Sequence, residues 1–101
     1  MKSKTVRWSR LAYLDLEAAH GYLRGENPDA ARRFAAAILR AVENLEHYPQ
    51  MGAVARDLQP VGTYRHVVCG HHRIIYRIDG KVLHILRVWD TRRNPEDLRA
   101  E

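Results

Sequence analysis

The last third of the chain, residues 62–98, is the feature that most constrains the fold. It contains three strand-like runs, at about Tyr64–Cys69, His72–Ile78 and Val82–Trp89. Asp79-Gly80 separates the second run from the third and predicts a two-residue hairpin turn, because a type I′ turn needs positive φ at both central positions. Strands joined by such short turns pair antiparallel. This segment therefore predicts an antiparallel sheet.

The same turn predicts how the strands align. Counting outward from it places Tyr76 opposite Leu83 and Ile74 opposite Ile85, on the face that we expect to lie under the helices. The alternate residues face the other way, where we expect arginines to meet solvent or a partner. This second set is Arg73, Ile75 and Arg77, beside Leu86, His84 and Val82. The last run is apolar on both sides, which is typical of a central strand.

The first half of the chain predicts one strand and two helices. Thr5–Trp8 alternates and is rich in strand formers, and Ser9 can cap a helix that ends near Gly25. Asn27-Pro28-Asp29 then offers an N-cap, a proline at the first helical position and an acid in the first turn of a second helix. Because so few residues join the helices, they should form an antiparallel hairpin.

The first helix carries a broad apolar face. Its two stripes are Leu11, Leu14, Ala18 and Tyr22, and beside them Ala12, Leu16, Ala19 and Leu23. Asp15 and Glu17 lie two positions apart on this helix, so their side chains point in different directions. We interpret them as part of a solvated face rather than as a catalytic carboxylate pair.

Together these elements predict an α+β domain that spans residues 1–101. The order is β-α-α-β-β-β, with a helical hairpin packed on a mainly antiparallel four-stranded sheet. Asn94-Pro95-Glu96-Asp97 can start a short helical turn after the last strand. A length of 101 residues fits one domain and leaves no room for a second core.

The charge balance favours an anionic partner. Lys and Arg number 17 against 12 acidic residues, which gives a formal net charge of +5. Such a surplus suits either nucleic acid or an acidic protein segment. No apolar run reaches the roughly 18–20 residues of a membrane span. Cys69 is the single cysteine, so an internal disulfide is excluded and a reducing, cytoplasmic location is expected.

Six arginines of the C-terminal third are the main candidates for function. They are Arg65, Arg73, Arg77, Arg87, Arg92 and Arg93. As a group they could grip phosphates or carboxylates through the bidentate geometry of guanidinium. For any single arginine, a solvated edge with an ion pair to Asp79, Asp90, Glu96 or Asp97 is the competing interpretation.

The histidines and the cysteine do not predict a reactive centre. His66, Cys69, His71, His72 and His84 show neither of the spacings, HxxxH or CxxC, that aim two ligands at one metal ion. Cys69 as a nucleophile would need a base and an oxyanion hole, and neither has a signature here. We therefore expect no metal site and no cofactor, and a buried Cys69.

Four stretches of the chain, in this order, resemble the RelE/ParE superfamily of small bacterial toxins. They are VRWSRLAYLDLEAAHGYL, NPDAARRF, YPQMG and RIIYRIDGKVLHILRVWDTRRNP. The ParE branch, also described as plasmid stabilisation proteins, matches best, because of the NP-opened second helix and the P-x-x-G turn before the sheet. The resemblance implies a helical hairpin packed on a curved antiparallel sheet.

The resemblance also implies a function. ParE-like toxins of type II toxin–antitoxin modules are associated with inhibition of DNA gyrase, whereas RelE-like toxins cut mRNA in the ribosome. Both kinds are neutralised by a cognate antitoxin, which is ParD-like in the ParE branch. The resulting hetero-oligomeric complex reaches operator DNA only through the antitoxin.

Individual residues follow from the resemblance. Arg73 matches a phosphate-contacting arginine of the RelE branch, Arg92 or Arg93 matches the arginine after the final strand, and Arg65 falls near basic strand positions. The chain has no tyrosine after Tyr76, although the RNA-cutting members use one near the C-terminus. That absence removes the partner that would activate a ribose 2′-hydroxyl.

Three hypotheses result. The first is a non-catalytic gyrase inhibitor, whose target- and antitoxin-binding residues are Arg65, Arg73, Arg77, Arg87, Trp89, Arg92 and Arg93. The second is a ribosome-dependent endoribonuclease, with Arg73, Arg92, Arg93 and Arg65 on the phosphate. The third is an inactive member that only binds an antitoxin.

Overall fold

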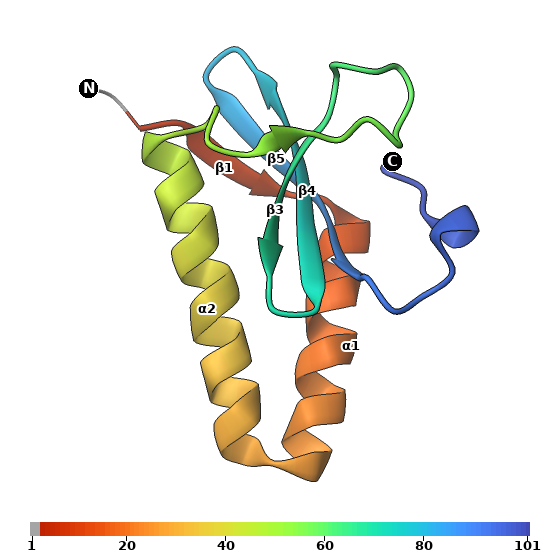
Figure 1. The fold of residues 1–101 in the computed structure, drawn as a ribbon. Coiled ribbons are helices and arrows are strands. Elements are labelled where there is room, and N and C mark those ends of the chain that lie inside the picture. The colour runs from red at the N-terminus through yellow and green to blue at the C-terminus, as the bar shows by residue number, and fades with distance from the viewer. Residues whose placement is uncertain (1–2) are drawn as a thin grey trace.

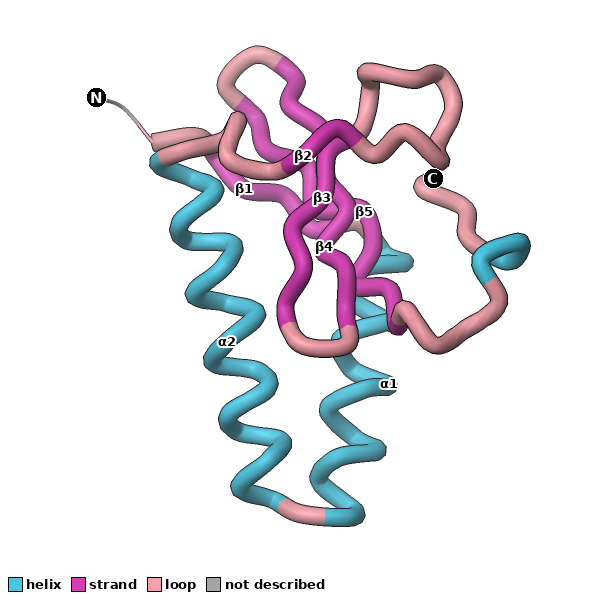
Figure 2. The backbone as a smooth tube through the Cα atoms, in the orientation of Figure 1, coloured by secondary structure: helices cyan, strands magenta, loops and turns pink. Residues whose placement is uncertain are grey.

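A computed structural model describes residues 3–101 and has the predicted α+β architecture (Figure 1). The elements are β1 (Thr5–Trp8), α1 (Arg10–Glu26), α2 (Pro28–His47), β2 (Ala53–Val54), β3 (Arg65–Cys69), β4 (His72–Asp79), β5 (Val82–Asp90) and the 3₁₀ turn η1 (Pro95–Asp97). The helical hairpin lies against one face of the sheet, and its closed end extends well beyond the strands (Figures 1 and 2). No helix within residues 3–101 is both long and apolar enough to cross a membrane.

Local capping explains where the helices begin. The Ser9 hydroxyl accepts a hydrogen bond from the backbone N–H of Ala12 at 3.1 Å, and it donates to the carbonyl of Leu86 at 2.9 Å. The Asn27 side chain accepts from the backbone N–H groups of Asp29 and Ala30, at 3.0 and 3.2 Å. Asn27 is both the C-cap of α1 and the N-cap of α2, so a single residue joins the helices and closes the hairpin.

The sheet has the order β1-β5-β4-β3-β2 and is mixed. Strand β1 runs parallel to β5, and every other neighbouring pair is antiparallel. The predicted fold class is therefore confirmed, and β5 has a neighbour on both sides, as its two-sided apolar pattern indicated, although β4 is the middle strand. The two-residue strand β2 is an addition to the four predicted strands, and it was too short to leave a periodic signal.

The predicted strand register was wrong by two positions on β5. Asp79 pairs with Val82, so Gly80 and Lys81 form the turn, and Tyr76 lies opposite Ile85 rather than Leu83. Only the glycine has a positive φ, +57°, which is the pattern of a type II′ turn rather than a type I′ turn. A shift of two residues keeps the side chains on their predicted faces as far as Ile85.

The β4–β5 ladder contains a bulge that no local signal marked. Ile75 pairs with Arg87 while Tyr76 pairs with Ile85, so Leu86 is the extra residue. Beyond the bulge Val88 joins the side of the sheet under the helices. It lies opposite Ile74.

Two hydrophobic clusters lie on opposite faces of the sheet. The larger, under the helices, contains Ala12, Ile38, Val42, Leu45, Ile74, Tyr76, Leu83, Ile85 and Val88. The smaller consists of Ala55, Leu58, Tyr64, Ile75, Leu86, Trp89, Leu98 and Ala100. The face that we expected to present arginines to solvent is thus covered by the β2–β3 loop and the C-terminal segment, which lie side by side (Figure 1).

The first apolar stripe of α1 is largely exposed. Leu11, Leu14 and Tyr22 are 39%, 42% and 71% exposed, whereas Ala12 of the second stripe is fully buried. The second stripe is the one that faces the sheet, since Leu16 also packs against the larger cluster.

Candidate functional site

A cleft of about 780 Å³ lies beside the closed end of the hairpin. Its walls are one face of α1, the facing side of α2, the β3–β4 turn and the end of β5. The lining residues are Asp15, Ala18, Ala19, Tyr22, Leu23, Arg33, Phe34, Ala37, Cys69, Gly70, His71, His72, Val88, Asp90, Arg92 and Arg93. The five residues from α1 recur at helical spacing, and two of them are alanines, whose small side chains leave room between the elements.

Basic side chains surround this cleft. Arg92 forms a bidentate pair with Asp90, with Nε–Oδ1 and Nη2–Oδ2 distances of 3.0 and 2.9 Å. These hydrogen bonds hold the pKa of the Asp90 carboxyl well below its usual range. Arg93 stacks over the indole of Trp89, with its guanidinium carbon 4.2 Å from the ring centroid. Arg33 has no ion-pair partner within residues 3–101.

The floor of the cleft is apolar and partly aromatic. The His72 ring is buried against Phe34, with centroids 4.9 Å apart, and burial lowers the pKa of His72. Cys69 is half-buried, and burial raises the pKa of its thiol. A thiol whose pKa is raised is a poor nucleophile at neutral pH. Among the described residues, no three His, Cys, Asp or Glu side chains are placed to hold a metal ion.

Asp15 forms a buried ion pair, so its assignment to a solvated face was wrong. Its two carboxylate oxygens accept from Nε and Nη2 of Arg87 at 2.7 and 2.9 Å, and the side chains are 12% and 8% exposed. One of the same oxygens accepts from the backbone N–H of Val88 at 3.0 Å. Asp15 thus supplies a hydrogen-bond acceptor to the edge of β5 at Val88, beyond the point where β1 ends. The available signal was its position three residues after Ala12 and four before Ala19, beside the apolar stripe that faces the sheet.

The face of the sheet that lies away from the helices holds another polar cluster, centred on Arg73. The guanidinium donates to both carboxylate oxygens of Asp57 at 2.9 Å, and its Nε donates to Nδ1 of His66 at 2.8 Å. Because arginine has no acceptor, Nδ1 is unprotonated and the neutral ring carries its hydrogen on Nε2. The Arg73 hydrogen bonds lower the pKa of Asp57, while burial and then the Arg73 charge lower the pKa of His66.

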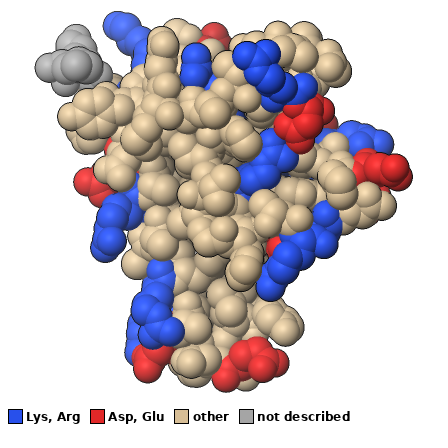
Figure 3. Space-filling model, viewed as in Figure 1, with Lys and Arg blue, Asp and Glu red and all other residues tan. Residues whose placement is uncertain are grey.

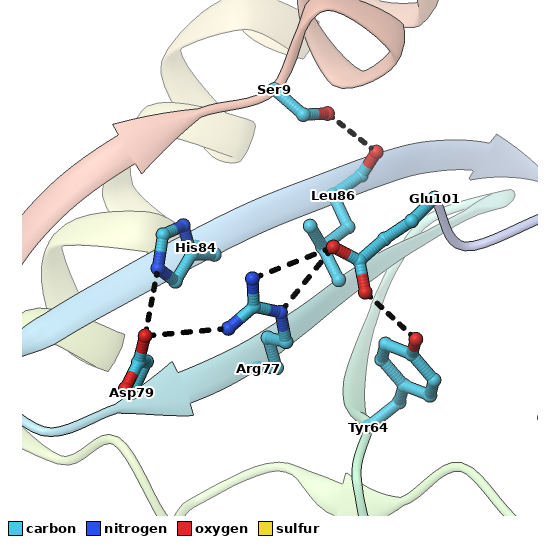
Figure 4. A network of polar contacts seen from close by, with 7 residues as sticks. All are labelled: Ser9, Tyr64, Arg77, Asp79, His84, Leu86 and Glu101. Atoms are coloured by element: carbon cyan, nitrogen blue, oxygen red, sulfur yellow. Dashed lines mark hydrogen bonds and ion pairs between the residues drawn. The ribbon is translucent and has the colours of Figure 1, made fainter. Parts of the chain in front are cut away.

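A third network on that face connects Arg77 with the end of the described chain (Figure 4). The Tyr64 hydroxyl donates to one Glu101 oxygen at 2.8 Å, and Arg77 approaches the other at 3.4 Å. On its other side Arg77 lies 3.7 Å from Asp79, which is also 3.8 Å from His84. The Glu101 hydrogen bond raises the pKa of Tyr64.

The structure separates the residues that the sequence proposed as one site. Arg92 and Arg93 are exposed beside the cleft, whereas Arg87 and Trp89 are buried behind it. Arg73 and Arg77 lie across the sheet in the two networks above. Arg65 donates to the carbonyls of Gly52 and Gln50 at 2.7 and 3.4 Å, so it supports a turn. In Figure 3 the basic side chains form several separate groups rather than one patch.

Sequence reasoning missed the cleft itself. Its apolar walls were interpreted as helix-packing stripes, and Arg33 was not singled out. Side-chain pattern alone does not distinguish a stripe that packs against the sheet from one that extends past its edge.

Three comparisons with known proteins place this geometry in context. The family model described as "ParE toxin of type II toxin-antitoxin system, parDE" matches residues 6–95. The protein named "Putative toxin Y4kP" of Sinorhizobium fredii is 38% identical over 56 residues, and the matched part covers 55% of this chain and 58% of that relative. The chain thus spans less than two thirds of that relative's length.

A solved structure titled "Chromosomal ParDE TA system from P. aeruginosa" contains a chain of the same fold. The TM-score is 0.70 at 24% sequence identity, and the match covers 85% of this chain and 94% of the other. At that identity the likeness establishes the fold, with the helical hairpin and mixed sheet described above.

Proposed function

The chain belongs to the ParE toxin family of type II toxin–antitoxin systems, and on that premise we propose that it is a non-catalytic toxin that inhibits DNA gyrase in the cytoplasm. A cognate ParD-like antitoxin holds it inactive in a hetero-oligomeric complex. The single domain of residues 1–101 carries both interactions. The observation that carries the antitoxin part of this proposal is the apolar cleft lined by Arg33, Arg92 and Arg93.

The cleft suits an acidic amphipathic segment of the antitoxin. Its apolar walls, among them Leu23, Phe34 and Ala37, would bury the apolar face of such a segment. Arg33, Arg92 and Arg93 would pair with acidic side chains along its polar face. The alanines of α1 would allow large anchor side chains to enter.

The hydrogen bonds of Arg73 on the sheet also favour inhibition by binding over RNA cleavage. Arg73, the candidate for phosphate contact, already donates to Asp57 and His66. A phosphate there would have to displace a carboxylate or lie beside its negative charge. Gyrase as the target rests on analogy with the ParE branch.

Purified protein distinguishes the two activities. We expect inhibition of gyrase supercoiling, relieved by the product of the neighbouring reading frame, and no cleavage of ribosome-bound mRNA. Cleavage of mRNA with unaffected gyrase would replace this proposal with the endoribonuclease hypothesis. Inactivity in both assays would indicate a member that only binds its antitoxin.

A matched pair of variants tests the role of the cleft. Ala37→Glu places a carboxylate on the cleft wall, whereas Ala36→Glu places one on the neighbouring exposed position outside it. Because a like charge in an apolar groove opposes an acidic partner, Ala37→Glu should weaken antitoxin binding by at least about tenfold. Calorimetric titration measures the affinity, and equal affinities for both variants would place the antitoxin elsewhere.

A further inference from the structure

Residues 48–52, here called the YPQMG turn, present two large apolar side chains to solvent. Tyr48 and Met51 are 64% and 54% exposed, on the segment that joins α2 to β2. Tyrosine and methionine are enriched at protein–protein interfaces, and a tyrosine has only two side-chain torsions to immobilise on binding. The pair therefore has the composition of a binding anchor.

The backbone of the YPQMG turn is held in place from beneath. The buried Tyr76 hydroxyl donates to the carbonyl of Pro49 at 2.7 Å and accepts from the backbone N–H of Gly52 at 3.0 Å. Burial raises the pKa of Tyr76, so its hydroxyl stays protonated and keeps both hydrogen bonds. The Met51 N–H also donates to the carbonyl of Tyr48 at 3.0 Å. Because the backbone is already ordered, the two exposed side chains lose little further entropy when a partner binds.

A positive charge without a counter-ion lies beside the turn. Nη1 of Arg65 donates to the carbonyls of Gly52 and Gln50, at 2.7 and 3.4 Å, on either side of Met51. Within residues 3–101 this guanidinium forms no ion pair, whereas every arginine of β4 and β5 has a carboxylate partner. An acidic side chain of a bound partner would supply the missing negative charge. The turn therefore fits a protein surface with an apolar pocket bordered by a carboxylate.

The YPQMG turn lies at the other end of α2 from the cleft. Helix α2 contributes Arg33, Phe34 and Ala37 to the cleft, near the closed end of the hairpin. About three helical turns, or about 16 Å along the axis, separate Ala37 from Tyr48. In Figure 1 the turn follows the opposite end of the helix. A partner can therefore contact the turn without using the cleft.

We propose that the YPQMG turn is the surface through which the chain contacts its target protein, with Tyr48 and Met51 entering an apolar pocket bordered by an acidic side chain. This inference rests on the function proposed above, in which the target is DNA gyrase and the cleft binds the antitoxin. Binding to the target and binding to the antitoxin are then separate properties of the two ends of α2.

Matched alanine variants test this separation. Tyr48→Ala and Met51→Ala should each raise the concentration that half-inhibits gyrase supercoiling at least about tenfold, because each removes an anchor side chain. The controls are Tyr13→Ala and Leu39→Ala, whose side chains are 56% and 54% exposed at other places on the helices, and they should leave inhibition unchanged. Calorimetric titration should give all four variants the antitoxin affinity of the unchanged chain. Urea unfolding verifies that each variant is folded.

Conservative and charged replacements examine the chemistry of the contact. Tyr48→Phe and Met51→Leu should retain inhibition, because they keep the aromatic ring and the apolar volume. Met51→Glu should inhibit more weakly than Met51→Ala, because its carboxylate would pair with Arg65 and repel the acidic side chain of the partner. Leu39→Glu is the control for the added charge and should behave like the unchanged chain.

Growth arrest of cells that express the chain distinguishes failure of this inference from failure of the proposed function. If the unchanged chain inhibits gyrase and both alanine variants of the turn inhibit it equally well, the turn is not the contact surface. If the unchanged chain leaves gyrase unaffected, the proposed function fails and growth arrest decides about the turn. Arrest that is lost in both alanine variants would support the turn as the target contact, whereas undiminished arrest, or no arrest by the unchanged chain, would overturn it.

Two further results would assign the turn to another partner and overturn the proposal. A loss of antitoxin affinity in the same alanine variants would make the turn an antitoxin contact. Binding of a labelled DNA or RNA oligonucleotide that Tyr48→Ala abolishes, measured by fluorescence anisotropy, would make it a nucleic-acid site.

Discussion

Gly52 shows how one atom can be decisive at the scale of the residue. Its backbone N–H donates to the Tyr76 hydroxyl at 3.0 Å, and that hydroxyl donates to the carbonyl of Pro49 at 2.7 Å. A β-carbon built at Gly52 would lie 2.4 Å from the same hydroxyl and 2.8 Å from the carbonyl of His66. Tyr76 is fully buried and the second neighbour is backbone, so neither can move away cheaply. Close approach is therefore the reason for glycine in the YPQMG turn.

Gly52→Ala should lower the free energy of unfolding by about 1–3 kcal/mol through overpacking. The control is Gly21→Ala, whose added methyl group meets nothing within 4 Å on the exposed side of α1. That change should stabilise the chain by about 0.5–1 kcal/mol, because alanine favours a helix. Urea unfolding measures both. Equal midpoints would mean that the turn yields to the methyl group.

The Arg87–Asp15 pair acts at the scale of the element, because it joins α1 to β5. It lies where β1 has ended, and it supplies the acceptor for the Val88 N–H that a longer β1 would have supplied. The Arg87 side chain also donates to the carbonyl of Arg99, so α1, β5 and the C-terminal segment meet at one guanidinium.

Asp15→Ala should destabilise the fold by about 3–5 kcal/mol, because it leaves a buried guanidinium without its counter-charge. Glu17→Ala, at an exposed position on the same helix, should change stability by no more than about 0.5 kcal/mol. Chemical unfolding of both variants provides the comparison. A cost for Asp15→Ala as small as that of the control would contradict the bridging role.

At the scale of the whole molecule, two histidines on opposite sides of the sheet, the half-buried His66 and the buried His72, link stability to pH. Burial is the first cause that holds the pKa of His66 and of His72 below the ordinary value of 6.5. The unfolded chain therefore takes up protons at a pH where the folded chain resists them. The stability from this difference is present above pH 6.5 and is lost as the pH falls through the lower folded pKa values.

The urea concentration at the midpoint of unfolding should therefore decrease as the pH is lowered from about 7.5 to about 5.5. This window is separate from that of Asp57 and Asp90, whose pKa values lie below the ordinary 3.8. His72→Gln should show a smaller decrease than the unchanged chain, whereas replacement of its exposed neighbour, His71→Gln, should leave the decrease unchanged. A pH profile that His72→Gln does not alter would assign the effect to other groups.

The sequence alone determined the features that depend on interactions between residues close together in the chain. Helix starts at Ser9 and Asn27 depend on capping within three residues, and the alternation of β4 and β5 depends on side chains two apart. These local rules were sufficient for the fold class, for the order of every element except β2, and for the faces of β4 and of β5 up to the bulge. The residues were also sufficient to indicate the family.

Only the tertiary structure decided which surfaces those elements present. Four features depend on contacts between segments distant in sequence. They are the bulge at Leu86, the ion pair of Asp15, the cleft between the hairpin and the sheet, and the covering of the second face by the β2–β3 loop and the C-terminal segment. An arginine looks the same in a sequence whether its carboxylate partner is 16 or 72 positions away, as for Arg73 and Arg87, or absent. For that reason the sequence could predict that the candidate site contains arginines of the C-terminal third, but not where these arginines lie in the fold.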